Sequence, residues 1–153
     1  PKFYARRRQD FDVIILLSYA SMARQLKPML NYYYAGNVPM YATSLVYSGS
    51  KNKQQDMDLN GIIFGEMPYL LSAKPPLVSQ SWPEQFNSYN RLYAMGSDAY
   101  LLTQQLNQLM LFPMMGVRNN TGTLFIDEHR QIIRQLEWAQ FKKGIVQPLV
   151  PNT

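Results

Sequence analysis

The segment from residue 11 to residue 44 constrains the fold of this chain more than any other part of the sequence. It opens with an apolar run at residues 13–17, which is typical of a β-strand covered on both faces. Apolar residues at helical spacing follow, and Gly36-Asn37 ends the helix before a second short apolar run at Val38. Two strands joined by a helix lie parallel in one sheet. The segment therefore predicts an α/β fold with a parallel sheet.

The carboxyl ends of these two strands indicate where a ligand would bind. Open parallel sheets bind their ligands at this edge, and polar residues stand at the end of the second strand. Tyr41 and Tyr47 bracket that end, where a cleft would open. We therefore predict Thr43, Ser44 and Tyr47 as ligand-cleft candidates, with Tyr47 in a binding role.

The helix between the strands carries two further signals. Ser18 or Ser21 is a candidate N-cap, because a hydroxyl oxygen can accept a hydrogen bond from the first helical turn. Pro28 lies inside the helical pattern, where it removes one backbone donor and is expected to kink the helix or mark its start. After the second strand, residues 47–58 are polar and predict an exposed loop or hinge.

The rest of the chain alternates between strand and helix patterns. Strands are predicted at residues 62–64, 123–126 and 145–150, and an irregular segment at 67–76. A capping box at 81–84 precedes a long helical region with an apolar stripe from Leu92 to Leu109. Residues 127–143 fit either a helix or a strand, and the pattern alone slightly favours the helix.

Composition limits the class of protein. With 153 residues the chain can form one domain with a real core, and no apolar run is long enough to span a bilayer. The absence of cysteine excludes disulfides and thiolate metal sites. The net charge of +5, the basic cluster at residues 6–8 and the tyrosines at 32–34 could serve nucleic acid. Three successive helical residues point in different directions, so no nucleic-acid partner is predicted.

No catalytic motif is complete. Residues 48–51 and 50–53 match the S-x-x-K nucleophile motif, but both copies lie in a polar segment and lack the S-D-N and K-T-G companions. Asp56 and Asp58 are too few ligands for calcium, so a solvated turn is expected. Asp127-Glu128 is expected in a turn or at a helix start and not as an acid/base pair. His129 is expected at the surface and not as a catalytic base. The sequence therefore predicts no enzyme, no cofactor and no metal.

Several stretches together resemble one known family, the LppC/LpoA family of outer-membrane lipoproteins. The resemblance covers nearly the whole chain in order. The stretches are ARQLKP (23–28), NYYYAG (31–36), VPMYATS (38–44), DLNGIIF (58–64), MPYLL (67–71), RLYAMGSDAY (91–100) and TGTL (121–124), followed by Trp138 and Phe141.

The resemblance implies a fold and a division of the chain. The family's C-terminal domain resembles type 1 periplasmic binding proteins, with two parallel-sheet, Rossmann-like α/β lobes around a cleft. This chain would be the second half of that domain. Residues 1–44 would end lobe two, 45–59 would be a hinge crossing, 60–126 would belong to lobe one, and 127–153 would return to lobe two. The resemblance also favours strand over helix for residues 132–141.

The resemblance implies a function as well. Family members bind and activate a class A penicillin-binding protein, the peptidoglycan synthase, and are not known as enzymes. They lie in the periplasm of Gram-negative bacteria, attached to the outer membrane by a lipid anchor that would lie upstream of this chain, which starts at Pro1 without a methionine. Peptidoglycan itself is a possible further partner. The alternative is a periplasmic module that senses a small ligand, such as an amino acid or a muropeptide.

Overall fold

The computed structural model describes residues 11–72 and 89–149, and its contacts divide the chain into two compact units. The first unit comprises Pro1–Phe64 and Ala139–Gln147, and the second comprises Gly65–Trp138 and Pro148–Thr153. The chain therefore passes from one unit to the other three times. The basic cluster at residues 6–8 and the capping box at 81–84 lie outside the described residues.

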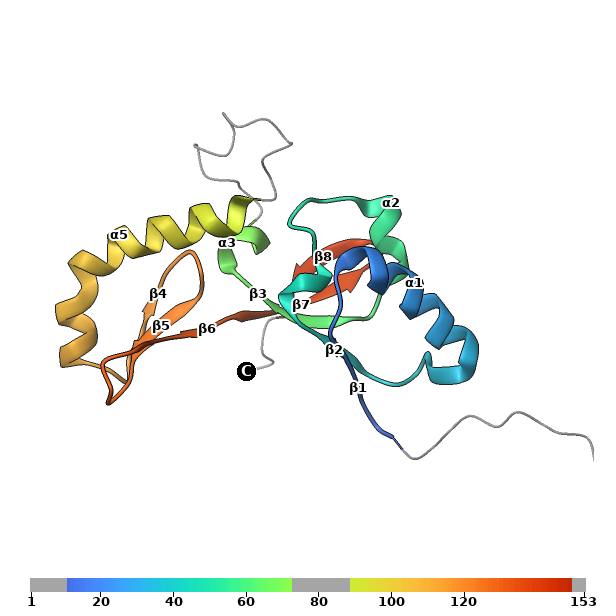
Figure 1. Ribbon diagram of the computed structural model, residues 1–153, viewed down its shortest axis with the longest axis horizontal. Coiled ribbons are helices and arrows are strands. Elements are labelled where there is room, and N and C mark those ends of the chain that lie inside the picture. Colours follow the sequence, from blue (N-terminus) through green and yellow to red (C-terminus); the bar gives the residue numbers. More distant parts are fainter. Residues whose placement is uncertain (1–10, 73–88, 150–153) are drawn as a thin grey trace, which may run out of the picture. The chain divides into compact units, whose positions relative to one another are not determined.

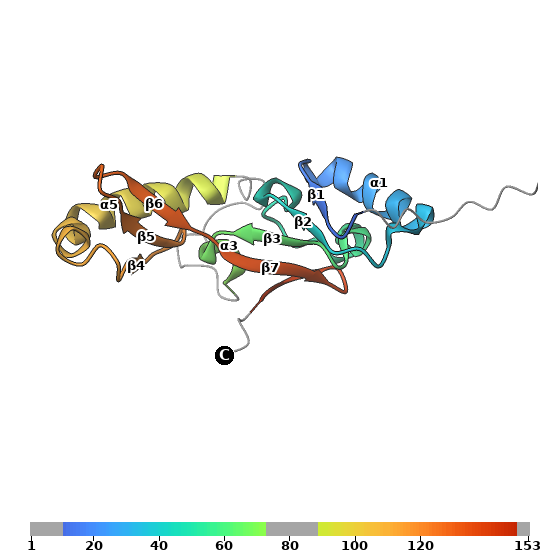
Figure 2. The ribbon, with the colours of Figure 1, turned by 90° about the horizontal axis from the view of Figure 1, so that it is seen from below.

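A five-stranded sheet runs in the order β1-β2-β3-β7-β8 (Figures 1 and 2). The strands are β1 (Ile14–Leu16), β2 (Met40–Ala42), β3 (Ile63–Glu66), β7 (Glu137–Lys142) and β8 (Ile145–Pro148). β1 pairs parallel with β2, and β2 pairs parallel with β3. The prediction of an α/β fold with a parallel sheet is confirmed.

The prediction that the first strand is covered on both faces is wrong. Leu16 is buried. It pairs with Ala42 on β2, and Ala42 pairs in turn with the fully buried Phe64 on β3. Ile15, on the opposite face, is 71% exposed, and Leu17 is 75% exposed. An apolar run is compatible with a strand that is buried on both faces, but it does not determine whether other elements pack on both faces.

Helix α1 (Ala20–Leu30) connects β1 to β2 (Figure 1). The N-cap is Tyr19, without a side-chain hydrogen bond, so neither Ser18 nor Ser21 is the predicted cap. Pro28 lies inside the helix and neither starts nor ends it. The irregularity follows one turn later, where Asn31–Ala35 is π-helical and Gly36 is the C-cap.

The segment after β2 is more ordered than its polar sequence predicts. It contains two 3₁₀ turns, Ser44–Val46 and Met57–Leu59, and the short helix α2 (Lys53–Asp56). Asn52 caps α2 by accepting a hydrogen bond from the Gln55 N–H at 3.2 Å. Val46, Asp56 and Leu59 are buried, so the segment is not an exposed loop throughout. Residues 45–59 lie in the first unit, and their role as a hinge stays a prediction.

In its described residues, the second unit combines two helices with a three-stranded antiparallel sheet. Helix α3 (Pro68–Leu71) replaces part of the predicted irregular segment, and α5 (Asn90–Leu111) confirms the long helix. The sheet has the order β4 (Val117–Arg118), β5 (Thr123–Ile126), β6 (Ile132–Gln135), and α5 lies beside β5 (Figure 1). Residues 132–135 and 137–142 are strands, so the strand interpretation is correct and the helical one is wrong.

The predicted apolar stripe of α5 is only partly buried, because Leu109 is in the core while most of its other members are exposed. Ala94, Asp98 and Leu109 are the buried residues, whereas Leu92, Met95 and Leu106 are exposed. The helix is therefore fixed to its unit partly by a polar residue. None of the helices in the described ranges combines the length and the apolar content that a membrane crossing requires.

Candidate functional site

The three predicted cleft residues do not share one environment. Thr43 is exposed and Ser44 is half-buried, just after the carboxyl end of β2. The Tyr47 side chain is only 3% exposed, and its ring lies 6.1 Å from the ring centroids of both Phe64 and Phe141. The Tyr47 ring is thus part of the core of the first unit. A ligand-binding role for the three residues stays a prediction.

A cavity of about 310 Å³ opens beside Tyr47 in the first unit. Its charged residues are Lys51, Lys53 and Asp56, and the turn between β7 and β8 completes it. Asp56 accepts a 2.8 Å hydrogen bond from Arg24, which joins α2 to α1. Sequence reasoning placed Asp56 in a solvated turn, and no local pattern connects it with an arginine 32 positions away.

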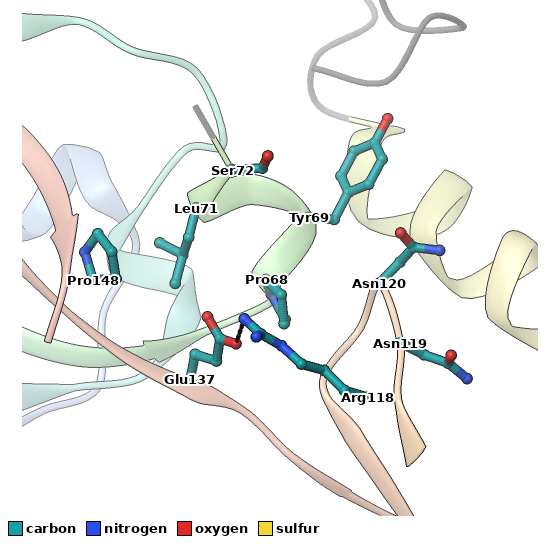
Figure 3. A pocket seen from close by; sticks show the side chains of 9 residues that line it. All are labelled: Pro68, Tyr69, Leu71, Ser72, Arg118, Asn119, Asn120, Glu137 and Pro148. Atoms are coloured by element: carbon teal, nitrogen blue, oxygen red, sulfur yellow. Dashed lines mark hydrogen bonds and ion pairs between the residues drawn. The ribbon is translucent and has the colours of Figure 1, made fainter. Parts of the chain in front are cut away.

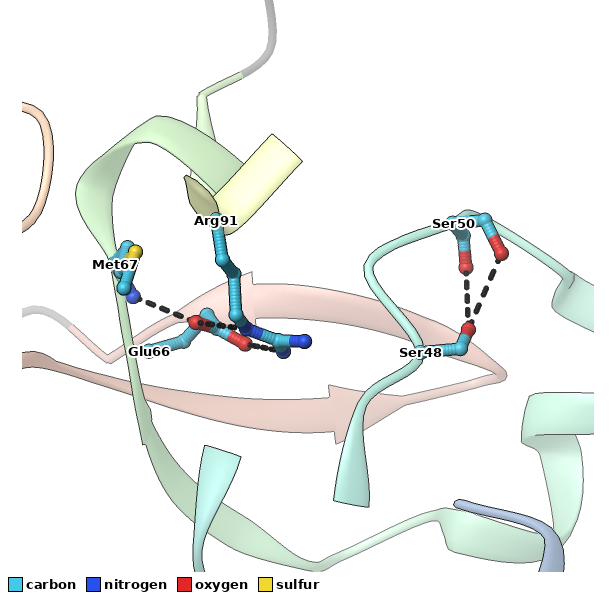
Figure 4. A network of polar contacts seen from close by, with 5 residues as sticks. All are labelled: Ser48, Ser50, Glu66, Met67 and Arg91. Atoms are coloured by element: carbon cyan, nitrogen blue, oxygen red, sulfur yellow. Dashed lines mark hydrogen bonds and ion pairs between the residues drawn. The ribbon is translucent and has the colours of Figure 1, made fainter. Parts of the chain in front are cut away.

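In the second unit, the fully buried Glu66 forms an ion pair with Arg91 (Figure 4). The carboxylate accepts a bond from Arg91 Nε at 3.3 Å and one from the Met67 backbone N–H at 2.9 Å, besides its bond to Arg91 Nη2. The pair connects the end of β3 to the first turn of α5. Because the carboxylate has donors for both oxygens, it serves as a fixed structural contact.

Asp98 on α5 holds the turn between β4 and β5. Its Oδ1 accepts bonds from the Asn120 N–H at 3.0 Å and from Asn120 Nδ2 at 2.9 Å. Its Oδ2 accepts bonds from the Thr121 N–H and Thr121 Oγ1, both at 2.7 Å. The Asp98 carboxylate therefore organises this turn through four hydrogen bonds.

That turn borders a second cavity, of about 380 Å³ (Figure 3). Tyr69, Leu71 and Ser72 line one side, Asn119 and Asn120 another, and the ion-paired Arg118 and Glu137 are in its wall. Sequence reasoning missed this cavity, because its residues come from α3, β4 and β7. Only the final fold brings them together.

The remaining candidate groups for chemistry are engaged in turns or are exposed. Ser48 Oγ lies 3.2 Å from Ser50 Oγ in an exposed loop just before the N-cap of α2 (Figure 4). Asp127 Oδ1 accepts bonds from the His129 and Gln131 backbone N–H groups at 2.9 and 2.7 Å, which closes the turn between β5 and β6. The described residues contain no group of three potential metal ligands.

Lys27 is the buried cation of α1, and we expect it to make stability depend on pH. Its ammonium donates a 3.0 Å hydrogen bond to Asn31 Oδ1, and burial lowers the pKa of Lys27 from 10.5. The unfolded chain therefore holds more protons than the folded chain between the lowered pKa and 10.5, so stability rises with pH across that window. Lys27→Met should remove this rise and stabilise the chain at pH 7 by about 1 kcal/mol.

Urea unfolding of both forms at a series of pH values measures the effect. The difference in free energy of unfolding between the wild type and Lys27→Met should shrink as the pH approaches 10.5. Because the two forms differ only at residue 27, the difference isolates the contribution of this side chain. If the difference in free energy of unfolding stays constant up to pH 10.5, burial does not lower the pKa of Lys27.

A family profile described as "LppC putative lipoprotein" matches residues 3–144. The chain belongs to this family. The match covers both units and includes every stretch on which the resemblance rests. In this LppC chain those stretches supply core and turn contacts: Leu59, Ile62 and Phe64 are fully buried, and residues 91–100 contain both Arg91 and Asp98.

Relatives and solved structures agree with the family. "Penicillin-binding protein activator LpoA" of Vibrio vulnificus is 33% identical over 141 residues, which cover 88% of this chain and 23% of that relative. The C-domain of LpoA (YraM) from Haemophilus influenzae, a regulator of PBP1A, has a TM-score of 0.79 at 25% identity and covers 94% of this chain and 46% of its own. The LppC chain thus spans about a quarter of the curated relative.

A further solved structure supports the fold class. The "Structure of a putative branched-chain amino acid ABC transporter" from Chromobacterium violaceum has a TM-score of 0.62 at 30% identity, over 85% of this chain and 42% of that chain. The LppC chain therefore has the α/β architecture of periplasmic binding proteins, as predicted.

Proposed function

We propose that this chain is part of a non-enzymatic activator of a class A penicillin-binding protein. The protein would be a periplasmic lipoprotein of the outer membrane that stimulates peptidoglycan synthesis. The observation that carries the proposal is the family match over residues 3–144, whose relatives include proteins named as activators. An activator that performs no chemistry must act through differential affinity for the active states of the synthase.

The structure offers a surface for such binding at the end of α5. Residues 110–115, which we call the methionine corner, include five apolar side chains, all exposed. Met114 and Met115 are 90% and 76% exposed. Methionine surfaces adapt to apolar partners because the side chain is flexible and polarisable. We propose that the methionine corner contacts an apolar patch on the synthase.

A chimera tests the function. This chain replaces the matching part of the Vibrio vulnificus relative, and binding to a purified class A penicillin-binding protein is measured together with its rate of glycan-strand synthesis. The chimera should bind and raise the rate. Met114→Asp with Met115→Asp should weaken binding about tenfold, since charged groups at an apolar contact must be desolvated.

The matched control is Met22→Asp, which places the same charge at an exposed methionine of α1. It should leave both binding and rate unchanged. If the chimera neither binds nor raises the rate, the proposed function is wrong. If the chimera activates the synthase, and the Met114→Asp, Met115→Asp double variant binds as tightly as the unsubstituted chimera, the methionine corner is not the contact.

The second candidate is a module that binds a small ligand at Thr43, Ser44 and Tyr47. Thr43 is exposed at the carboxyl end of β2, where parallel sheets place ligands, and the structure described as a branched-chain amino acid ABC transporter shares the fold. A ligand of the folded state raises the melting temperature with concentration. A thermal-shift screen of amino acids and muropeptides on the chimera tests this candidate, and a flat screen counts against it.

A further inference from the structure

The cavity beside Tyr47 combines an apolar lining with two ammonium groups. Tyr47, Ile145 and Val146 supply the apolar part, and Lys51 and Lys53 supply the positive charges. All five residues belong to the first unit, and the cavity has a volume of about 310 Å³. That volume lies at the lower end of the range for small-molecule sites. The cavity, which we call the lysine cavity, is therefore large enough for a small organic ligand.

The charge of the lysine cavity is positive, because its carboxylate is already paired. Asp56 is 2% exposed, and its Oδ1 accepts the 2.8 Å hydrogen bond of Arg24, which is not part of the lining. No ion pair within residues 11–72 and 89–149 includes Lys51 or Lys53. Two like charges at one cavity repel each other, and an anion bound between them replaces this repulsion with attraction.

The walls of the lysine cavity are held in place by contacts within the first unit. An added Cβ at Gly144 would overlap the Lys53 backbone oxygen, so the β7–β8 turn lies directly against α2. The Gly144 N–H also donates a 2.8 Å hydrogen bond to Asn60 Oδ1. The pair of Asp56 and Arg24 fixes α2 to α1. Because the walls are fixed before a ligand arrives, binding requires little further ordering of the chain.

We propose that the lysine cavity binds a small organic anion with an apolar body. Its carboxylate or phosphate group lies between the ammonium groups of Lys51 and Lys53, and its apolar body lies against Tyr47 and Val146. A lysine ammonium is a compact point charge that suits either anionic group. The proposal uses neither Thr43 nor Ser44, and it does not rest on the activator function.

Three probes test the proposal on the Vibrio vulnificus chimera. Phenylacetate and phenyl phosphate are anions with the same aromatic ring, and phenylacetamide is the neutral counterpart of phenylacetate. A ligand-observed NMR titration should give a Kd of about 1 mM or below for at least one anion, and binding of the amide at least about tenfold weaker. The tighter anion identifies the head group. Equal binding of all three probes, or no binding of either anion, would overturn the proposal.

A double substitution locates the charges that hold the anion. Lys51→Gln with Lys53→Gln should weaken binding of the tighter anion at least about tenfold. The matched control, Lys142→Gln with Lys143→Gln, removes the same charge from exposed positions outside the lining. The control should leave the Kd within about twofold, because solvent and salt screen charges outside the cavity. Equal weakening by both double variants would mean that the net charge, and not the cavity, attracts the anion.

A chemical protection experiment needs no variant. Acetylation of the chimera by an N-hydroxysuccinimide ester, followed by peptide mass spectrometry, reports the access of the reagent to each lysine. A saturating concentration of the tighter anion should make acetylation of Lys51 and Lys53 severalfold slower and leave Lys142 unchanged. Unchanged acetylation at all three lysines would exclude the lysine cavity as the site. Neither binding nor acetylation depends on the synthase, so a negative result here leaves the activator function standing.

Discussion

Asp98→Ala should lower the free energy of unfolding by about 3–5 kcal/mol, because it removes the acceptor of four hydrogen bonds in a buried site. Alanine suits a helix, so α5 itself loses nothing from the exchange. The cost arises in the turn, where the backbone N–H groups of Asn120 and Thr121 lose their acceptor. Thr121 is buried, and water cannot easily replace the carboxylate there.

Urea unfolding of the variant is compared with two others. Asp58→Ala removes the same charge from an exposed position and should change stability by less than about 0.5 kcal/mol. Thr121→Val removes one of the four bonds and should cost about 1–2 kcal/mol. If Asp98→Ala costs no more than Thr121→Val, the carboxylate does not organise the turn as a unit.

Local sequence patterns correctly predicted the elements whose apolar spacing can be recognised within the element itself. The β1–α1–β2 segment and α5 fall into this group, since their apolar spacing and the stop at Gly36 are visible in the sequence. The predicted burial of these elements is less accurate. The exposed side of β1 and the largely exposed stripe of α5 show that spacing tells which faces are apolar, but not how far each of them is covered.

Residues 127–143 show how pairing across the sheet decides a local ambiguity. Their apolar spacing fits a helix, yet Ile132–Gln135 pairs with β5 in a register from Ile126↔Ile132 to Thr123↔Gln135. Asp127 and the left-handed Arg130, at φ 61°, form the tight turn that sets this register. The pairing with β5 and the tight turn are both invisible to a search for apolar residues at helical spacing. The family resemblance gave the correct answer because it included the fold.

The long-range contacts of the buried carboxylates could not be predicted from the sequence for a similar reason. Asp56 pairs with Arg24, Glu66 pairs with Arg91, and Asp98 reaches Asn120 across 22 positions. A carboxylate in a polar segment reads as solvated unless its partner is known. Tyr47 is the converse case, since its position at a strand end suggested a ligand contact while its ring packs against Phe64 and Phe141.

Gly144→Ala should destabilise the chain by about 3–5 kcal/mol, because the β7–β8 turn approaches α2 at this residue. Gly144 has a φ of 72°, and an added Cβ would overlap the Lys53 backbone oxygen and lie 3.1 Å from Met57 Sδ. Its N–H also donates a 2.8 Å bond to Asn60 Oδ1, so the turn cannot move away freely. The preceding Lys143 adopts a φ of 53° with a full side chain. Left-handed backbone alone therefore does not require glycine in this turn.

Gly61→Ala separates the two contributions. Gly61 has a φ of 88°, but nothing lies within 4 Å of an added Cβ, so its substitution carries only the backbone strain of about 1 kcal/mol. The difference between the two variants in urea unfolding measures the close approach of the turn to α2. If both cost the same, the turn can shift away from Lys53, and the wall of the cavity beside Tyr47 is adaptable. A large difference means that this wall is rigid, as the second candidate function requires of a preformed site.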